Sequence, residues 1–264
     1  MDNRVFCPTQ KETKYDNMKI FGLIGYPLTH SFSPQYFKEK FIRENISDSY
    51  YNLYPLESLQ SFHTFIKNNS NLHGLNITIP YKKEILSYID EVDEIALKVK
   101  AVNTIKIKRE GGKILTKGFN TDIFGFEHAL FPLLKNHHKT ALVLGNGGAS
   151  SAIQFVLHKL GIDYYVVSRN PEANIISYSE ANQKYLSHTF LIINTTPLGT
   201  YPASSTYPLI DYEKLTRNHL LFDLVYNPNE TVFMEKAKEK GAFSCNGQRM
   251  LELQAEESWR IWMS

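Results

Sequence analysis

The chain has 264 residues, 42% of them hydrophobic, and its 29 Lys and Arg residues nearly balance 27 Asp and Glu residues, for a formal net charge of +2. This length exceeds one average domain and allows a sizeable core. Without a basic block, the charge balance argues against nucleic acid and membrane surfaces as partners and favours a small molecule. We expect no membrane span and no secretory signal, because no apolar run has the required length or position.

The two cysteines, Cys7 and Cys245, are far apart and match no spacing typical of a disulfide or a metal site. This usage suits a reducing cytosol, so we expect a cytoplasmic protein without a bound metal. Residues 1–17 are polar and aperiodic, and a second methionine, Met18, stands just before the first apolar run. We interpret 1–17 as a disordered extension, with an upstream start site as the alternative.

Strand and helix patterns alternate in the first half of the chain. Ser33 and Pro34 are typical of the N-cap and the first residue of a helix. The pair Gly111-Gly112 between two alternating runs indicates a hairpin, so a βαβαβ start leads into a mixed sheet. In order, the predicted elements are a strand from Lys19 to Gly25, a helix from Ser33, a strand at 50–54, a helix through Leu59, Phe62 and Ile66, a strand at 74–79, a helix at 92–98, strands at 102–108 and 114–117, and a helix at 123–135.

The stretch ALVLGNGGAS at 141–150 predicts a buried strand, a tight glycine turn and a helix start. Glycines let the backbone approach a ligand closely, and the free amides of a helix N-terminus attract an anion such as a dinucleotide pyrophosphate. The spacing departs from G-x-G-x-x-G because Ser150 stands where Gly or Ala is expected. An ordinary glycine-rich turn therefore remains an alternative.

Beyond this turn the elements alternate regularly, which predicts a doubly wound parallel sheet. They are a helix at 150–160, strands at 164–168, 190–194 and 220–225, a helix at 230–240 closed by Gly241, and a last helix at 249–262. The predicted fold class is therefore α/β with two domains: an N-terminal α/β substrate domain with a mixed, mainly parallel sheet, and a Rossmann-like domain.

The residues after the second strand of a nucleotide-binding unit select the dinucleotide, because an acid there binds the ribose hydroxyls of NAD. This chain has Ser168, Arg169 and Asn170 at that position. Arg169 can form charge-assisted bonds with a 2'-phosphate, which favours NADP(H) as cofactor. A solvated arginine is the alternative.

Three polar clusters follow predicted strands of the first half. Ser31 and Ser33 precede a helix, where hydroxyls and amides suit a carboxylate, although capping alone also explains Ser33. Asn76 and Thr78 share one face of a strand that would normally be apolar on both faces. Asp122 follows Asn120 and Thr121 at a helix start, for which a plain cap is the alternative.

Lys82 and Asp122 are the candidates for proton exchange with a substrate hydroxyl or carbonyl while a nicotinamide exchanges the hydride. The alternative is a surface charge, as for the neighbouring Lys83.

Read jointly, these clusters resemble the shikimate dehydrogenase family from Met18 to the C-terminus. The motifs that carry the resemblance are GYPLTHSFSP at 25–34, NITIPYK at 76–82, AVNTI at 101–105, GFNTDIFG at 118–125, GNGGAS at 145–150 and NGQRMLELQA at 246–255. The resemblance implies NADPH-dependent reduction of 3-dehydroshikimate to shikimate, a step of chorismate and aromatic amino acid biosynthesis. It also implies Lys82 and Asp122 as the catalytic pair.

The resemblance implies further site residues in two groups. The residues implied for the substrate or for support of the catalytic pair are Ser31, Ser33, Asn76, Thr78, Asn103, Tyr226 and Gln254. The residues assigned to the cofactor are Gly145, Asn146, Gly147, Gly148, Ala149, Ser168, Arg169, Asn170, Thr195, Thr196, Leu198, Gly247 and Met250. Because the family's last helix returns to the first domain, we expect a substrate domain of 18–121 plus 248–264 and a cofactor domain of 122–247, with a cleft between them.

Two departures from the family pattern leave alternatives open. A second basic residue is missing after Arg169, and Pro197 in the loop at 194–199 is unusual for the family. A quinate/shikimate dehydrogenase that uses NAD, or a non-catalytic NADP-binding sensor, are therefore the alternative functions. We expect a monomer or a homodimer.

Overall fold

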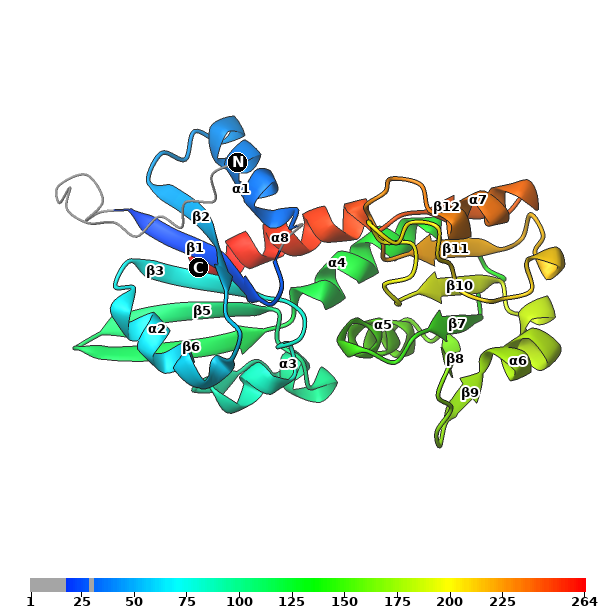
Figure 1. Ribbon diagram of the computed structural model, residues 1–264, viewed down its shortest axis with the longest axis horizontal. Helices are drawn as coiled ribbons and strands as arrows, with labels where there is room; N and C mark the ends of the chain where they lie inside the picture. Colours follow the sequence, from blue (N-terminus) through cyan, green and yellow to red (C-terminus); the bar gives the residue numbers. More distant parts are fainter. Residues whose placement is uncertain (1–17, 29–30) are drawn as a thin grey trace. The chain divides into compact units, whose positions relative to one another are not determined.

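The computed structural model describes residues 18–28 and 31–264, which form two compact units (Figure 1). One unit extends to Glu91 and includes Thr104–Lys117, and the other comprises Val92–Asn103 and Gly118–Ser264. The predicted extension at 1–17 lies outside the described residues. The predicted functional division, 18–121 plus 248–264 against 122–247, stays a prediction.

The first sheet has six strands in the order β2-β1-β3-β5-β6-β4. β1 pairs in parallel with β2 and β3, whereas β3 pairs antiparallel with β5. This confirms the predicted mixed sheet, and Gly111 and Gly112 take positive φ in the turn of the hairpin. The strands are β1 (Lys19–Gly25), β2 (Ser49–Pro55), β3 (Leu72–Ile77), β4 (Glu91–Val92), β5 (Thr104–Glu110) and β6 (Lys113–Phe119).

Helices α1 (Ser33–Arg43) and α2 (Phe62–Asn68) accompany this sheet. Each buries its apolar face, and the ring of Phe37 on α1 stacks on Tyr51 of β2 with centroids 4.4 Å apart. Single turns of 3₁₀ helix precede α2 at Leu59–Ser61 and follow β3 at Glu84–Ser87.

Two sequence predictions in this unit were wrong in detail. Ser33 is not the N-cap of α1, because Phe32 already has helical dihedrals and occupies that position. Ser33 instead donates its backbone amide to Oγ of Ser31 at 3.3 Å. β3 ends at Ile77 rather than at residue 79, because the chain turns before Pro80, which has no amide to donate.

The second sheet has six strands in the order β12-β11-β10-β7-β8-β9, and every pair is parallel (Figure 1). This confirms the predicted doubly wound sheet. The strands are β7 (Thr140–Leu144), β8 (Asp163–Ser168), β9 (Ile175–Ser177), β10 (Leu191–Asn194), β11 (Leu220–Asp223) and β12 (Phe243–Cys245). The sequence did not predict β9 and β12, which are three-residue edge strands without an apolar run of their own.

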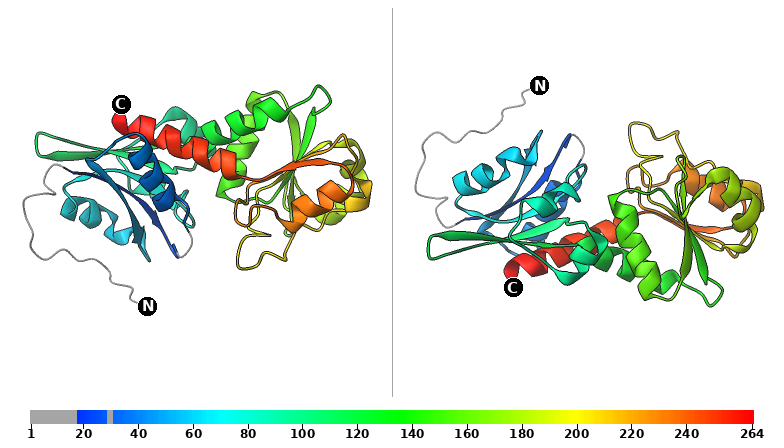
Figure 2. Two further views of the ribbon diagram at one scale, coloured as in Figure 1. Left: turned by 90° about the horizontal axis from the view of Figure 1, so that it is seen from above. Right: turned by 90° about the horizontal axis from the view of Figure 1, so that it is seen from below.

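Alternate residues of this sheet belong to two separate cores. Ala141 and Val143 of β7 pack with α4 and α5, whereas Leu142 and Leu144 pack with α7 and the helical turns after α6. This is the alternation of a strand that is buried on both faces, and Figure 2 shows helices on both sides of the sheet. The helices of the unit are α3 (Glu94–Val99), α4 (Thr121–Leu130), α5 (Gly148–Lys159), α6 (Tyr178–Glu180), α7 (Val232–Glu239) and α8 (Gln248–Met263).

Helix α4 packs closely along α8. A Cβ on Gly125 would lie 2.5 Å from the backbone oxygen of Met250, so only glycine permits this approach. α4 ends at Leu130, five residues earlier than predicted, because Pro132 redirects the chain into a 3₁₀ turn at Phe131–Leu133.

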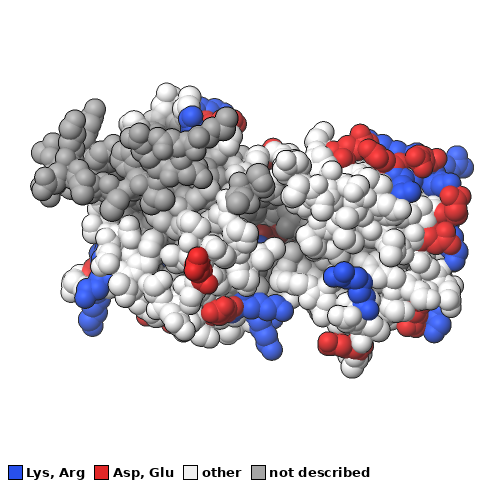
Figure 3. Space-filling view, viewed as in Figure 1, with Lys and Arg blue, Asp and Glu red and all other residues white. Residues whose placement is uncertain are grey.

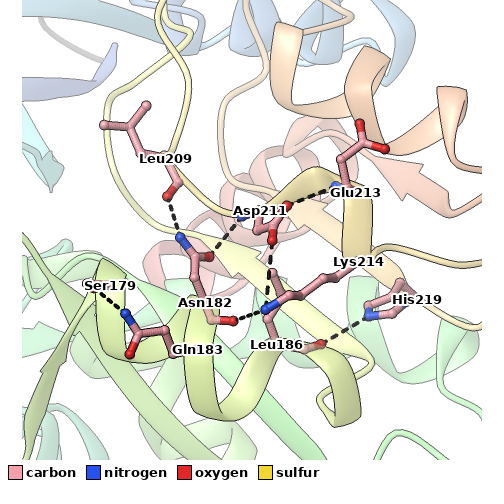
Figure 4. A network of polar contacts seen from close by, with 9 residues as sticks. All are labelled: Ser179, Asn182, Gln183, Leu186, Leu209, Asp211, Glu213, Lys214 and His219. Carbon is pink, nitrogen blue, oxygen red and sulfur yellow. Dashed lines mark hydrogen bonds and ion pairs between the residues drawn. The ribbon is translucent and has the colours of Figure 1, made fainter.

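A polar network ties the β10–β11 connection to the helical segment after α6 (Figure 4). Asn182 donates its side-chain amide to the oxygen of Leu209 at 3.2 Å and accepts from the amide of Asp211 at 2.8 Å. His219 contacts the oxygen of Leu186 at 3.4 Å, and burial lowers its pKa. These bonds hold the second half of the connection, from Leu209 to His219, against the helical segment.

Charged side chains of both signs are interspersed on the face drawn in Figure 3. Among the described helices, none is long and apolar enough to cross a membrane.

Candidate active site

In the first unit, the predicted polar residues lie beyond or near the C-terminal ends of the parallel strands. Ser31 and Ser33 follow β1, and Thr78 and Lys82 follow β3. The C-terminal ends of parallel strands are the usual place for ligand sites in α/β proteins. With Asn76, which lies within β3, this unit contains five of the predicted site residues.

Asn76 is 6% exposed and belongs to a chain of side-chain hydrogen bonds. Its Oδ1 accepts from the hydroxyl of Tyr51 at 2.8 Å, and its Nδ2 donates to Oγ1 of Thr104 at 3.1 Å. Tyr51 also hydrogen-bonds to the side chain of Ser33, and burial raises the pKa of its hydroxyl. This series of hydrogen bonds therefore links α1, β2, β3 and β5.

Tyr51 and Thr104 were missed by the sequence analysis. Tyr51 belongs to no polar cluster along the chain, and Thr104 lies within the AVNTI motif beside Asn103 but was assigned no role of its own. Their relation to Asn76 depends on the pairing of β3 with β5 and of β1 with β2 and β3.

Lys82 lies in the turn after β3 and is half-buried, whereas the adjacent Lys83 is exposed. Tyr81 anchors this turn, since its hydroxyl donates to the oxygen of Leu56 at 2.7 Å and its amide to the oxygen of Thr78 at 2.9 Å. Thr78 lies against Gly25, where any Cβ would come within 2.4 Å of Cγ2 of the threonine. These contacts hold the turn in which Lys82 stands.

In the second unit, Asp122 stands in the first turn of α4 and is 6% exposed. Nδ2 of Asn103 donates to Oδ1 of Asp122 at 2.9 Å. Oδ1 of Asn103 accepts from the backbone amide of Thr121 at 2.7 Å, which fixes the orientation of the Asn103 amide. Asn120, and neither Thr121 nor Asp122, is the N-cap of α4, so the plain-cap explanation for those two residues is wrong.

Gln254 on α8 joins the same network. Its Oε1 lies 3.5 Å from Nδ2 of Asn103 and accepts from Oγ1 of Thr121 at 3.3 Å. Ser258, one turn further along α8, is completely buried and lies 3.1 Å from Oγ1 of Thr121. Neither Thr121 nor Ser258 was assigned to the site from the sequence. Residues from two distant stretches of the chain, before β5 and on α8, therefore join Thr121 in the network around Asp122.

The glycine turn joins β7 to α5 as predicted. Gly145 has φ +111, and a Cβ on it would lie 2.7 Å from Oγ1 of Thr195. A Cβ on Gly147 would have no heavy atom within 4 Å among the described residues, and α5 begins after Gly147 with no side chain bonded to its first amides. The turn is therefore tight on one side and open on the other, with amides available for an anion.

The other predicted cofactor residues all belong to this second unit. Arg169 and Asn170 are exposed after β8, and Oγ of Ser168 accepts from the amide of Asn170 at 3.2 Å. Thr195, Thr196 and Leu198 follow β10. Asn146, Gly148 and Ala149 lie in the glycine turn or at the start of α5.

Tyr226, Gly247 and Met250 follow β11 or begin α8. Gly247 donates its amide to the oxygen of Val225 at 3.0 Å, and a Cβ there would lie 2.2 Å from the oxygen of Leu224. Tyr226 is half-buried, and Met250 is buried in the core between α4 and α5. In the described ranges, no group of three or more His, Cys, Asp or Glu side chains could hold a metal ion.

Comparisons with known proteins point to one family. Residues 23–105 match the model of the shikimate dehydrogenase substrate binding domain. A shikimate dehydrogenase (NADP(+)) of Staphylococcus aureus is 38% identical over 255 residues, which cover 92% of this chain and 91% of that protein.

Solved structures agree with this result. A shikimate dehydrogenase of Peptoclostridium difficile superposes with a TM-score of 0.80 at 34% identity, covering 93% of this chain and 92% of the other. Another, solved in complex with NADP+, gives a TM-score of 0.81 at 32% identity and covers 93% of this chain and 90% of its own.

Proposed function

The chain belongs to the shikimate dehydrogenase family, and we infer from this that it is an oxidoreductase that reduces 3-dehydroshikimate to shikimate with NADPH, reversibly. The reaction is a step of chorismate and aromatic amino acid biosynthesis. The observation that carries the inference is the 38% identity over 92% of the chain to an NADP-dependent relative.

The second unit has features that fit NADP(H). The open side of Gly147 and the uncapped first amides of α5 suit the pyrophosphate, and the exposed Arg169 suits a 2'-phosphate. The residues that we propose to hold the cofactor are Gly145, Asn146, Gly147, Gly148, Ala149, Ser168, Arg169, Asn170, Thr195, Thr196, Leu198, Gly247 and Met250. When bound, NADPH supplies the hydride that reduces the substrate carbonyl.

We propose Lys82 and Asp122 as the catalytic pair. Reduction places a hydride on the carbonyl carbon and a proton on its oxygen, and Lys82 donates that proton as general acid. Asp122 is held by Asn103 as an acceptor that orients the ammonium group or the substrate hydroxyl. In the reverse direction, the lysine accepts the hydroxyl proton.

We propose that the substrate carboxylate binds the hydroxyls of Ser31 and Ser33. Asn76, Thr78, Asn103, Tyr226 and Gln254 complete the substrate set, as ligands of the ring hydroxyls or as supports of the pair. Three of them, Asn76, Asn103 and Gln254, are already bound to neighbouring side chains, which supports an orienting role for all three.

The test is a steady-state assay of the purified full chain with the four pairings of NADP+ or NAD+ with shikimate or quinate. We expect the highest kcat/KM for NADP+ with shikimate. A higher value for NAD+ with quinate would establish the alternative that the single arginine after β8 leaves open. Binding of NADP+ without turnover of either substrate would identify a sensor instead.

We also propose that the protein acts in the cytoplasm as a monomer or a homodimer and binds no nucleic acid. The net charge of +2 and the free thiol of Cys245 support this. Sedimentation of the purified chain with and without DNA measures its mass and its binding, and a mass above that of a dimer or co-sedimentation with DNA would contradict the proposal.

A further inference from the structure

Asp223 is a fully buried carboxylate at the C-terminal end of β11. Its Oδ1 accepts from Nδ2 of Asn194 at 2.9 Å and from the amide of Val225 at 3.0 Å, and its Oδ2 accepts from Oγ1 of Thr231 at 2.6 Å. Burial raises its pKa to about 6. Burying a charge of this kind costs free energy unless all of its hydrogen bonds are made. An apolar residue would fill the same space at a lower cost in free energy.

Asn194 transmits the position of this carboxylate to the loop that follows β10. A carboxylate only accepts hydrogen bonds, so Asp223 fixes which end of the Asn194 amide faces it. Oδ1 of Asn194 then accepts from the backbone amide of Thr196 at 3.0 Å and from Oγ1 of Thr196 at 2.6 Å. Oγ1 of Thr196 in turn accepts from the amide of Leu198 at 3.3 Å.

The loop so arranged lies against the glycine turn. A Cβ on Gly145 would approach Oγ1 of Thr195 to 2.7 Å and Cγ2 of Thr196 to 3.0 Å. Thr195 also donates its hydroxyl to the oxygen of Leu144, the last residue of β7, at 2.8 Å. A displacement of Thr195 or Thr196 would therefore change the space beside the turn.

We propose that Asp223 is a positioning residue for the cofactor: through Asn194 it holds Thr195 and Thr196 against the glycine turn. This inference rests on the proposed role of that turn and loop in binding NADP(H). Asp223 itself contacts neither substrate nor cofactor in this proposal, and its effect passes entirely through Asn194.

The test compares three variants by NADP+ titration and by thermal melting. Asp223→Leu keeps the branched shape of the side chain and removes both acceptors, and we expect NADP+ binding to weaken by about ten- to a hundredfold, as for an unpaired buried donor. Asp223→Asn keeps an oxygen for Asn194 and Val225 and an amide for Thr231, and should bind NADP+ within about threefold of the parent, because it replaces the bonds rather than deleting them.

The control variant is Thr189→Val, which changes another buried polar side chain just before β10, at the opposite end of that strand. Among the described residues, Oγ1 of Thr189 has no hydrogen-bond partner, so we expect unchanged NADP+ affinity. Unchanged affinity in a cooperatively melting Asp223→Leu variant, or equal losses in Asp223→Leu and Thr189→Val, would overturn the proposal.

If Asp223→Leu does not fold, a second pair of variants, at Thr231, tests the proposal instead. Thr231→Val removes one donor to the carboxylate, and Thr231→Ser keeps it, so only the valine variant should bind NADP+ more weakly. Equal affinity of the two would refute the proposal. The unsubstituted chain separates the two inferences: if it neither binds NADP+ nor oxidises shikimate, the proposed function itself is wrong.

Discussion

Asn103 and Asp122, nineteen positions apart in the chain, are joined by a hydrogen bond of 2.9 Å between Nδ2 and Oδ1 in a buried setting. The other end of the Asn103 amide is bound to the backbone of Thr121, so its donor end faces the carboxylate. A residue that stands before β5 therefore helps to orient Asp122 at the start of α4.

The variant Asn103→Ala should lower kcat about ten- to a hundredfold, because Asp122 loses its orienting donor. It should also reduce the free energy of unfolding by about 1 to 3 kcal/mol, since the Thr121 amide loses its acceptor. Urea unfolding and steady-state kinetics measure both effects.

Asn120→Ala is the matched control: it removes the N-cap of α4 and destabilises by about 0.5 to 2 kcal/mol, but should leave kcat unchanged. Equal kcat losses in both variants would contradict the orienting role.

Lys82 and Lys83 form a natural pair for testing the proton donor. Lys82→Ala should lower kcat by about 10² to 10⁴ with little change in the KM for shikimate, the usual range for loss of general acid-base catalysis. Lys83→Ala removes the same charge from an exposed neighbour and should retain the parent rate. Normal turnover by the Lys82 variant would eliminate it as the catalytic acid.

Gly145 and Gly147 should respond differently to alanine. Gly145→Ala introduces a Cβ 2.7 Å from Oγ1 of Thr195 at a φ of +111, so we expect a loss of about 1 to 3 kcal/mol in unfolding free energy. Gly147→Ala meets no described atom within 4 Å and should leave stability nearly unchanged. If the open side of the turn receives the pyrophosphate, Gly147→Ala should nevertheless weaken NADP+ binding. Calorimetric melting and NADP+ titration distinguish these effects, and an unaltered NADP+ affinity of Gly147→Ala would argue against pyrophosphate at this point.

The stability of the protein should carry a pH-dependent contribution from Asp223. Burial raises its pKa from 3.8 to about 6, so the folded chain keeps a proton that the unfolded chain has lost between these values. The contribution of this group to the free energy of unfolding is fully present below pH 3.8. It falls as the pH rises through 6, by about 3 kcal/mol in all. The nearby thiol of Cys245 and hydroxyl of Tyr212 do not titrate in this window, because burial raises both pKa values.

The comparison of the parent chain with Asp223→Asn isolates this contribution, because all other carboxylates are common to both. Urea unfolding from pH 4.5 to 7.5 should show the parent losing stability relative to the variant as the pH rises. Parallel pH profiles of the two proteins would show that Asp223 keeps its ordinary pKa.

The sequence alone determined the order and type of the long elements, because apolar periodicity and the turn chemistry of glycine and proline are local properties. It also placed the glycine turn between β7 and α5 and predicted both sheets. It did not predict β9 and β12, because three residues are too few to show a periodic pattern. It also misplaced the N-cap of α1.

Tertiary structure alone decided which polar side chains meet. Nothing along the chain links Tyr51 to Asn76, Ser258 to Thr121 or Asp223 to Asn194, because strand register and the packing of α8 along α4 bring them together. A buried polar group needs a partner, and only the folded arrangement provides one. The sequence therefore indicated the residues that we propose for the reaction, and the folded structure showed which other residues hold them in place.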